Sequence, residues 1–486
     1  MSPIADLAAT LYPTPLHSTP LYSTPKRIHL IGIGGSGLSA IAQVLLEEGY
    51  AVSGSDQQAS PATESLAARG AQVAIGHRAE TVVGADLVVV SSAIPPGNPE
   101  IAEARARHIP VVKRAELLGR MMRDRRGVAV AGTHGKTTTT GMVAQILLEA
   151  GQDPTFIVGG VIGSLGTNAR AGSGPFVVEA DEYDRTFLGL RPWAAVVTNV
   201  EHDHPDCYPT FEAMLGAFGE FVDLLPPDGV LVACQDNLPA KVLGEQWALR
   251  KGQPVVMYGL GDNAAWRAVD VQANNAGGSD YVLLHHRQSA GLVRLRVPGL
   301  HNVVNSLAAL AVADQLGVSF AQASRSLTEF RGMLRRFEIK GQAAGVTVVD
   351  DYGHHPTEIK ATLAAARARF PGRGIWAVFQ PHTYSRTKTL MDDFCKAFAD
   401  ADHVIVTDIY ASRERDTLGV SSADIVARMN DVRRRDVRHI SGLDQAAAYL
   451  LANVKPGDVV ITLSAGDGNR VGETLLAALP LASPRG

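Results

Sequence analysis

A turn between an apolar strand pattern and a helical pattern has the composition of a phosphate-binding loop. It reads Gly132, Thr133, His134, Gly135, Lys136, Thr137 and Thr138. Backbone N–H groups of such a turn hold phosphate oxygens, Lys136 can reach the β and γ phosphates of ATP, and the Thr137 hydroxyl can ligate Mg²⁺. The first glycine of the full Walker pattern would fall at Val130, so the loop is shortened at its start. The Lys-Thr pair after glycine still predicts an ATP site.

Acidic residues and histidines follow two later apolar runs. Residues 176–178 are followed by Glu179, Asp181 and Glu182, and the run that ends near residue 200 is followed by His202, Asp203 and His204. Because parallel strands end at the same edge of a sheet, we expect these side chains beside the phosphate loop, where they can serve the Mg²⁺ of ATP. A solvated sheet rim is the alternative explanation.

A second glycine-rich turn lies near the start of the chain. Gly32, Gly34 and Gly37 form GxGxxG directly after an apolar strand pattern and before a helical pattern. Glycines there let a diphosphate approach backbone N–H groups, and Asp56, which ends the next strand pattern, suits a hydrogen bond to a ribose hydroxyl. The pattern predicts a nucleotide such as NAD or a UDP-sugar. Glycines that only permit tight packing are the alternative.

A third group of polar residues follows two strand patterns near the end of the chain. It comprises Asp350, Asp351, Tyr352, His354 and His355 after the first pattern, and Gln380, His382, Tyr384, Ser385 and Arg386 after the second. A single histidine is most often structural, whereas several at the carboxyl ends of neighbouring strands point to a ligand.

These groups require strands that end at the edges of parallel sheets. Short β-branched runs alternate with helical patterns from residue 27 onward, restart at residue 127 and restart again near residue 346. This alternation predicts right-handed βαβ units and an α/β protein of three domains. We predict a disordered Pro-rich tail (1–25), a Rossmann-like domain (26–124), a central P-loop ATPase-like domain with a mixed sheet (125–330) and a C-terminal Rossmann-like α/β domain (331–486). Residues 280–287 and 291–298 predict an antiparallel hairpin at the edge of the central sheet.

The composition argues against several classes of protein. The chain has 486 residues, of which 46% are hydrophobic and 19% charged, and this predicts several packed cores. Its 45 Lys and Arg against 49 Asp and Glu leave no basic excess for binding nucleic acid. With no apolar run near the roughly 18 residues of a membrane span and no secretory signal pattern, we expect a cytoplasmic protein without membrane contact. The three cysteines, Cys207, Cys234 and Cys395, have no CxxC spacing, so we expect free core thiols.

Together these motifs resemble those of the Mur ligases, ATP-dependent amide-forming enzymes of peptidoglycan precursor synthesis. The strings that carry the likeness are GIGGSGLS at Gly32, GTHGKTTTT at Gly132, GTNAR at Gly166, EADE at Glu179, HNVVN at His301, RRF at Arg335, DDYGHHPTE at Asp350 and QPHTYSRT at Gln380. They are most similar to those of the members that add L-alanine to UDP-N-acetylmuramate. Residues 207–225 contain no lysine, whereas several other members carry a carbamylated lysine there, and this absence fits the alanine-adding type.

The resemblance implies roles for individual residues. The implied catalytic residues are Lys136, Glu179, His204, Arg336 and Asp351, and the implied magnesium site is Thr137, Glu179 and His204. ATP would be held by the loop from Gly132 to Thr138 together with Asn302, Asn305, Arg336 and Asp351. The UDP-sugar would be held by Gly32, Gly34, Gly35, Ser36, Gly37, Asp56, Thr167, Asn168 and Arg170. The amino acid would meet Tyr352, His354, His382 and Arg386. Some alanine-adding members have arginine where this chain has Thr383, so the planar fork of Arg386 would carry more of the carboxylate recognition.

The resemblance also implies a reaction. ATP would phosphorylate the lactyl carboxylate of the sugar to an acyl phosphate, and the amine of alanine would displace phosphate, with His204 or His354 as the proton acceptor. Because the three substrates fall to three domains, we expect the domains to close around them. We expect a monomer or weak homodimer. The alternatives are a tripeptide-recycling ligase of the same family, an NAD-dependent oxidoreductase and a nucleotide-gated binding protein.

Overall fold

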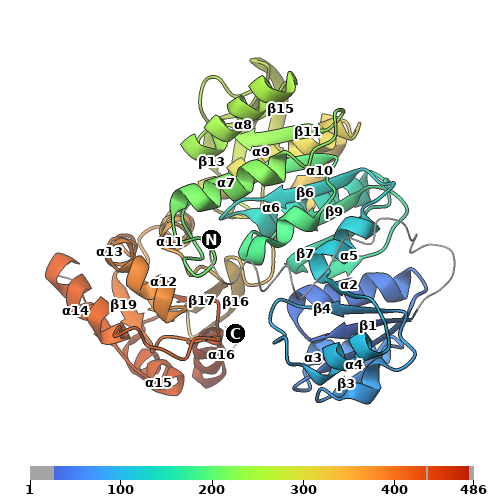
Figure 1. Cartoon of the computed structure of the whole chain (residues 1–486). Coiled ribbons are helices and arrows are strands. Elements are labelled where there is room, and N and C mark those ends of the chain that lie inside the picture. Colours follow the sequence, from blue (N-terminus) through green and yellow to red (C-terminus); the bar gives the residue numbers. More distant parts are fainter. Residues whose placement is uncertain (1–26, 434–435, 481–486) are drawn as a thin grey trace, which may run out of the picture.

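The computed structural model describes residues 27–433 and 436–480 and contains three β-sheets flanked by helices (Figure 1). The predicted Pro-rich tail therefore lies outside the described residues.

The first sheet, in the blue unit of Figure 1, is parallel throughout with the order β3-β2-β1-β4-β5. Its strands are β1 (Arg27–Ile31), β2 (Ala51–Asp56), β3 (Gln72–Ile75), β4 (Leu87–Val90) and β5 (Val111–Lys113). Its helices are α2 (Ser36–Glu47), α3 (Pro61–Ala68), η1 (Ala79–Val82), α4 (Pro99–Ala106) and α5 (Arg114–Met121). The order reverses beside β1, so the turn at residues 32–37 occupies the position where sheets of this kind bind ligands.

The central sheet has ten strands in the order β15-β14-β13-β12-β11-β10-β6-β9-β7-β8. They are β6 (Gly127–Ala131), β7 (Thr155–Ile162), β8 (Thr167–Arg170), β9 (Phe176–Glu179), β10 (Ala194–Val197), β11 (Val230–Cys234), β12 (Val256–Gly259), β13 (Trp266–Ala273), β14 (Ser279–His285) and β15 (Gln288–Arg294). The helices are α6 (Lys136–Glu149), η2 (Tyr183–Gly189), α7 (Phe211–Val222), α8 (Leu238–Lys251), α9 (Leu300–Gln315) and α10 (Phe320–Glu329). The neighbours of β14 and the β7–β8 pair are antiparallel, and the remaining pairs are parallel. This is the predicted mixed sheet.

The predicted hairpin is present as β14 and β15 at the edge of the central sheet. The structure adds β13 as a third antiparallel strand, which the sequence did not predict. The pairing of β13 with β14 shifts register between Val269 and Gln272, and Asp270 has a φ of 53°. This irregularity breaks the alternation of inward and outward side chains that marks a strand in a sequence.

The third sheet has the order β16-β17-β21-β18-β19-β20, in which β16 and β17 are antiparallel and all other pairs are parallel. Its strands are β16 (Glu338–Ala343), β17 (Val346–Asp351), β18 (Ile375–Phe379), β19 (His403–Val406), β20 (Asp436–His439) and β21 (Val459–Leu463). Its helices are α11 (Pro356–Arg369), α12 (Tyr384–Thr389), α13 (Met391–Cys395), α14 (Ser422–Arg433), α15 (Leu443–Asn453) and α16 (Asn469–Ala478). The sequence predicted the third restart near Val346, but the sheet begins one strand earlier because β16 is a largely exposed edge strand with few apolar residues. The predicted α/β fold with three sheet domains is confirmed, whereas the boundaries proposed for the domains stay predictions.

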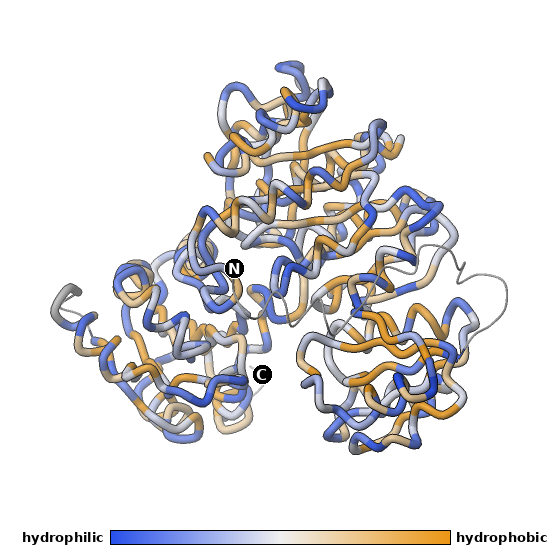
Figure 2. Tube along the Cα trace, viewed as in Figure 1, coloured by the Kyte–Doolittle hydropathy of each residue, from blue (hydrophilic) through white to orange (hydrophobic). Residues whose placement is uncertain are grey.

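The cores of the three units are not equally separate. One continuous apolar core includes Leu30 of β1 and Val128 of β6, and α2 packs against β7 and β8. The third unit has its own cores, which contain Val349 and Val348 on opposite faces of β17. Figure 2 shows hydrophobic chain segments gathered along the strands of each unit. Within residues 27–433 and 436–480, no helix combines the length and apolarity needed to cross a bilayer.

Candidate active site

The phosphate loop joins β6 to α6, as the sequence predicts for a strand-to-helix turn. Gly132 has a φ of 136° and Gly135 a φ of 82°, a region that favours glycine. A Cβ atom on Gly132 would lie 1.9 Å from Thr198 Oγ1, so this glycine is also required by the close approach of β10. The N–H of His134 donates to Asn199 Oδ1 at 2.9 Å and fixes the loop against the next strand end.

Lys136 is held by its own loop and by a buried glutamate. Its Nζ donates to the Gly132 carbonyl at 2.6 Å, to the Thr133 carbonyl at 3.2 Å and to Glu182 Oε1 at 2.9 Å. Burial alone would raise the pKa of the Glu182 carboxyl, but the charge of Lys136 and the neighbouring His204 hold that pKa below its ordinary value. Glu182 is therefore the ionised counter-ion of Lys136. The sequence placed Glu182 in the acidic cluster without this role.

Two of the three predicted magnesium residues lie together. The Thr137 hydroxyl donates to Glu179 Oε1 at 3.1 Å, and Glu179 Oε2 accepts the N–H of Gly159 at 2.8 Å. A hydroxyl and a carboxylate oxygen in one place are the ligands that Mg²⁺ prefers, so this pair fits that ion. The third predicted residue, His204, lies instead beside Glu182, with Nε2 3.7 Å from Glu182 Oε1.

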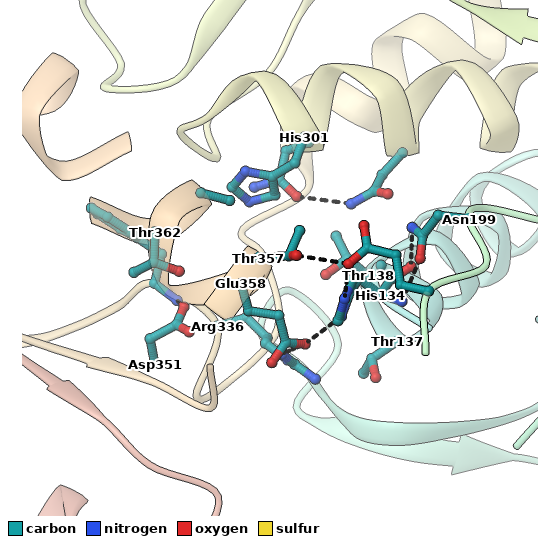
Figure 3. Close-up of a pocket in the computed structure, with 16 residues that line it drawn as sticks. His134, Thr137, Thr138, Asn199, His301, Arg336, Asp351, Thr357, Glu358 and Thr362 are labelled. Atoms are coloured by element: carbon teal, nitrogen blue, oxygen red, sulfur yellow. Dashed lines mark hydrogen bonds and ion pairs between the residues drawn. The ribbon is translucent and has the colours of Figure 1, made fainter. Parts of the chain in front are cut away.

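A cavity of about 180 Å³ brings together most of the residues predicted to hold ATP, although Gly132, Thr133 and Lys136 do not line it (Figure 3). Those that line it are His134, Gly135, Thr137, Thr138, Asn302, Asn305, Arg336 and Asp351. Asn302 Nδ2 donates to the Pro298 carbonyl at 2.7 Å, and Asn305 Nδ2 donates to Asn302 Oδ1 at 3.2 Å, so the two amides are oriented as a unit. The lining also includes Asn199, Glu201, His301, Thr357 and Glu358, which the sequence analysis did not assign to ATP.

The charges of this cavity come from segments far apart in sequence. His134 has Nε2 3.3 Å from Glu201 Oε2 and Nδ1 3.4 Å from Glu358 Oε1. Burial would lower the pKa of His134, but the two carboxylates outweigh it and raise that pKa to about 9. Arg336 Nη1 lies 3.4 Å from Glu358 Oε1, and Asp351 accepts the N–H groups of Gly353 and Phe337 at 2.7 and 2.8 Å. Glu358 has one local sequence signal, because it completes a capping box at the start of α11.

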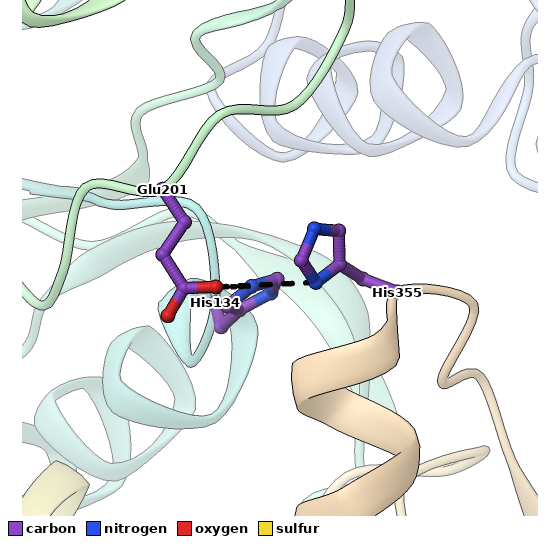
Figure 4. Close-up of side chains that lie close together, drawn as sticks. All are labelled: His134, Glu201 and His355. Atoms are coloured by element: carbon purple, nitrogen blue, oxygen red, sulfur yellow. Dashed lines mark hydrogen bonds and ion pairs between the residues drawn. The ribbon is translucent and has the colours of Figure 1, made fainter. Parts of the chain in front are cut away.

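Figure 4 shows His134, Glu201 and His355 converging from the phosphate loop, the segment after β10 and the start of α11. Their ligand atoms lie within 4.8 Å of one another, and this is the one such group of His, Cys, Asp or Glu side chains among the residues that the structure describes. It is not the predicted magnesium set. His355 caps α11, since its Nδ1 accepts the N–H of Thr357 at 3.3 Å.

A larger cavity of about 850 Å³ opens beside the first glycine-rich turn. It is lined by Ser36 and Gly37 of that turn, by Asn168 and Glu179, and by Thr137 and Arg336. Because Thr137 and Arg336 line both this cavity and the smaller one, the two spaces meet at the phosphate loop.

The structure gives several predicted sugar residues other partners. Asp56 Oδ2 accepts the N–H of Gly34 at 2.9 Å and so holds the turn itself. Thr167 accepts a hydrogen bond from Gln43 at 3.3 Å, and Arg170 pairs with Asp153 at 2.5 Å. Thr167 and Arg170 lie on the edge strand β8, whereas Asp56 is the last residue of β2. Arg114, which the sequence missed, lines the cavity and pairs with Asp181 at 2.5 Å.

A third cavity, of about 240 Å³, lies between the central and C-terminal units. Its lining residues are Tyr183, His204, Pro205, Asp206, His382, Thr383, Ser385, Arg386, Ser412, Arg413 and Glu414. Of the residues predicted to meet the amino acid, Tyr352 lines the large cavity instead. The His354 ring packs against Tyr352 and His382, with centroid distances of 5.5 and 5.7 Å.

Arg386 lines the third cavity and is also paired with a protein carboxylate. Its Nε and Nη2 donate to the two carboxylate oxygens of Asp203 at 2.9 and 3.2 Å, and its Nη1 donates to the His382 carbonyl at 2.9 Å. Both side chains of the pair are about 95% buried. The planar fork that the sequence offered to a substrate carboxylate is therefore occupied by Asp203, and it joins the central unit to the C-terminal unit.

Comparisons with known proteins cover most of the chain. Residues 27–126 match the model described as "Mur ligase family, catalytic domain", residues 130–313 the "Mur ligase middle domain" and residues 335–466 the "Mur ligase, glutamate ligase domain". The UDP-N-acetylmuramate--L-alanine ligase of Geobacter sp. (strain M21) is 49% identical over 460 residues, which are 94% of this chain and 98% of that relative. The protein of the same name from Geobacter sulfurreducens is 44% identical over 93% of this chain and 98% of its own length.

Solved structures give the same result. MurC, the UDP-N-acetylmuramate-alanine ligase of Thermotoga maritima, has a TM-score of 0.78 at 29% identity, covering 93% of this chain and 98% of its own. The murein peptide ligase mpl from Psychrobacter arcticus has a TM-score of 0.70 at 26% identity, covering 95% and 100%. On the matched domains and the shared length, this chain belongs to the Mur ligase family.

Proposed function

We propose that this protein is the ligase that joins L-alanine to the lactyl carboxylate of UDP-N-acetylmuramate, with ATP converted to ADP and phosphate, during peptidoglycan precursor synthesis in the cytoplasm. The names of the relatives at 44–49% identity support this activity. The single structural observation that carries it is that the ATP-type cavity and the large cavity meet at Thr137 and Arg336. A phosphoryl group leaving ATP there reaches a carboxylate held in the large cavity.

Each substrate has a cavity of suitable chemistry. The paired amides of Asn302 and Asn305 suit the edge of an adenine base, and the phosphate loop lies beside them. The large cavity has room for a nucleotide sugar, and the N-terminus of α2 at Ser36 and Gly37 suits its diphosphate. The third cavity has the size of a small amino acid and contains His204 and His382.

The first step transfers the terminal phosphoryl group of ATP to the carboxylate, giving a mixed anhydride that an amine can attack. The cations available to offset charge on the oxygens of the transferring group are Lys136 in the phosphate loop, and Arg336 and the protonated His134 in the lining of the smaller cavity. Mg²⁺, when bound at Thr137 and Glu179, adds positive charge to the same phosphate oxygens. Positioning and electrostatics thus account for most of the catalysis.

The second step needs an acceptor for the amine proton. Burial and the neighbouring Arg386 lower the pKa of His354 to about 3, so this imidazole is neutral near pH 7. Its Nδ1–H donates to the Tyr352 carbonyl at 3.0 Å, which leaves the lone pair on Nε2. Burial would lower the pKa of His204, but the neighbouring carboxylates of Glu182 and Asp203 raise it. The free Nε2 of His354 can accept the amine proton, and His204, which lines the third cavity, is the other candidate acceptor.

The tripeptide-recycling ligase is the second candidate, because a murein peptide ligase shares the fold at a TM-score of 0.70. The higher TM-score of 0.78 for the alanine ligase favours L-alanine. The relatives described above are ligases, which leaves the oxidoreductase alternative without support. A monomer or weak homodimer remains our prediction for the oligomeric state.

The test is phosphate release from ATP and UDP-N-acetylmuramate while single amino acids, or the tripeptide L-alanyl-γ-D-glutamyl-meso-diaminopimelate, are added in turn. We expect L-alanine to give the highest kcat/KM, and ¹⁸O from the sugar carboxylate to appear in the released phosphate. The K136A variant should lose turnover but still bind the UDP-sugar. Preference for the tripeptide, or phosphate without ¹⁸O, would contradict the proposal.

A further inference from the structure

The cavity between the central and C-terminal units has no evident binding partner for the α-carboxylate of an amino acid. Under the proposed function, on which this inference rests, an amino acid binds there and its amine reacts. Its α-carboxylate stays ionised and needs a cation or several N–H donors when water is excluded. The basic residues that line this cavity are His204, His382, Arg386 and Arg413.

Arg386 is already committed to protein groups. Asp203 takes Nε and Nη2 at 2.9 and 3.2 Å, and His382 takes Nη1 through its carbonyl at 2.9 Å and its Nδ1 at 3.1 Å. Replacing Asp203 by a substrate carboxylate would leave the Asp203 charge buried without a partner, which is costly. Arg386 is therefore built to hold the two units together.

The two histidines are also poorly suited to the carboxylate. Burial and the charge of Arg386 lower the pKa of His382 to about 4, so its ring is neutral near pH 7. His204 Nε2 faces the carboxylates of Glu182 and Asp203 at 3.7 and 3.8 Å. Thr383 contributes only a neutral hydroxyl, which contacts the Ser385 hydroxyl at 3.2 Å.

Arg413 is the remaining cation, and its loop is anchored on both sides of it. On one side, the N–H of Tyr410 donates to the Pro381 carbonyl at 2.8 Å, and the Tyr410 ring stacks on His382 at 5.7 Å and 12°. On the other side, Glu414 Oε2 accepts the N–H groups of Tyr384 and Ser385 at 2.6 and 3.1 Å. Arg413 is thus carried to the cavity by a segment bound to the loop that contains His382 and Arg386.

The guanidinium of Arg413 is exposed and has room for a ligand. Within the part of the chain that the structure describes, no ion pair or hydrogen bond engages it. Two carboxylates also line the cavity, but both have donors of their own: Asp206 accepts the Tyr183 hydroxyl at 3.1 Å, and Glu414 is bonded as described. We propose that Arg413 binds the α-carboxylate of the amino-acid substrate, while Arg386 positions the cavity wall through Asp203.

The test compares R413A, R413K and R415A with the unchanged enzyme. Arg415 is an exposed arginine two residues along the same loop that does not line the cavity, so R415A is the matched control. The probes are L-alanine and L-alaninamide, which keeps the amine but has no carboxylate. We expect R413A to raise the KM for L-alanine roughly 10- to 100-fold, the loss typical of one charge-assisted pair, with an intermediate increase for R413K. The KM values of R413A for ATP, UDP-N-acetylmuramate and L-alaninamide should stay within about twofold of those of R415A.

The outcomes are distinguishable. An R413A enzyme whose KM for L-alanine equals that of R415A overturns the assignment of Arg413. An equal rise for L-alanine and L-alaninamide also overturns it, because the residue would then act on the structure of the loop. If the unchanged enzyme releases no phosphate with L-alanine, the proposed function itself fails.

Discussion

At the scale of single residues, neighbours that are distant in sequence decide the charge of the phosphate loop. His134 lies between Glu201 and Glu358, and Lys136 is paired with Glu182. Each of these carboxylates comes from a different strand end or helix start. The part of the stabilisation of the His134 charge that comes from Glu358 therefore depends on contact between the central and C-terminal units, because Glu358 belongs to α11.

The raised pKa of His134 predicts a specific dependence of stability on pH. A group whose pKa is higher in the folded state than in the unfolded state stabilises the folded protein. For His134 this stabilisation is complete below the unfolded-state pKa of about 6.5 and is lost as pH rises through the folded-state pKa of about 9. At about 1.4 kcal/mol per pKa unit, the effect is on the order of 3 kcal/mol. We expect the difference in urea midpoint between the wild-type protein and H134Q to be large at pH 6 and to shrink progressively up to pH 9.5. H108Q, at an exposed histidine, is the control and should show no such trend. A difference that is independent of pH would contradict the assigned protonation.

At the scale of elements, the candidate catalytic groups are placed by turns at the carboxyl ends of strands. β6 lies between β10 and β9, so the loop after β6 meets the segments that follow both neighbours. The closeness of β10 is also why Gly132 has no room for a side chain. The chemistry of this loop depends on strand order as much as on its own residues.

Two glycines, one before α6 and one after it, test whether the close approach of β10 constrains the phosphate loop. G132A adds a Cβ at 1.9 Å from Thr198 Oγ1 and at a φ of 136°, so we expect kcat/KM for ATP to fall at least 100-fold as the loop shifts. Gly151, after the end of α6, has a φ of 76° but no atom within 4 Å of its Cβ position. G151A should cost only about 1 kcal/mol of stability and leave kcat/KM nearly unchanged. Steady-state kinetics measure kcat/KM, and urea unfolding measures stability. If G132A and G151A lost the same fraction of kcat/KM, a clash at the phosphate loop would not be the cause.

At the scale of the whole molecule, the three units are joined in two different ways. The first two share a continuous apolar core, whereas the third meets the central unit through ion pairs and hydrogen bonds. The connecting segment includes Arg335 and Phe337, both with positive φ, at 61° and 49°. We infer that closure for turnover involves the third unit moving about residues 330–337, while the first two units move together.

The buried pair of Asp203 and Arg386 should therefore control that motion. D203N leaves Arg386 buried without a counter-charge, and breaking such a pair costs about 3–5 kcal/mol. We expect faster trypsin cleavage at Arg331, Arg335 and Arg336 and a lower melting temperature. D392N, which breaks the exposed pair with Arg428, should change stability by less than about 1 kcal/mol and leave the cleavage rate unchanged. Equal cleavage of the two variants would show that the pair does not hold the units together.

Short-range patterns in the sequence were sufficient to predict the three α/β sheets and the positions of the motifs. Gly132 and Gly135 indicate a turn from local sequence alone, and the alternating apolar runs indicate strands. These predictions therefore needed no information about tertiary contacts. Several strands were not predicted, and two of them, β13 and β16, are irregular or polar, so that their apolar alternation is weak.

Only the tertiary structure determined which charged groups meet. Neither the pairing of Lys136 with Glu182, nor the occupation of Arg386 by Asp203, nor the place of Arg413 beside His382 has a signal in sequence spacing. Electrostatic interactions depend on distance through space and on exclusion of water, and both are set by the order of strands and the contact between units. A sequence lists the charges of this protein, and the fold decides which of them are neutralised and which are left for substrates.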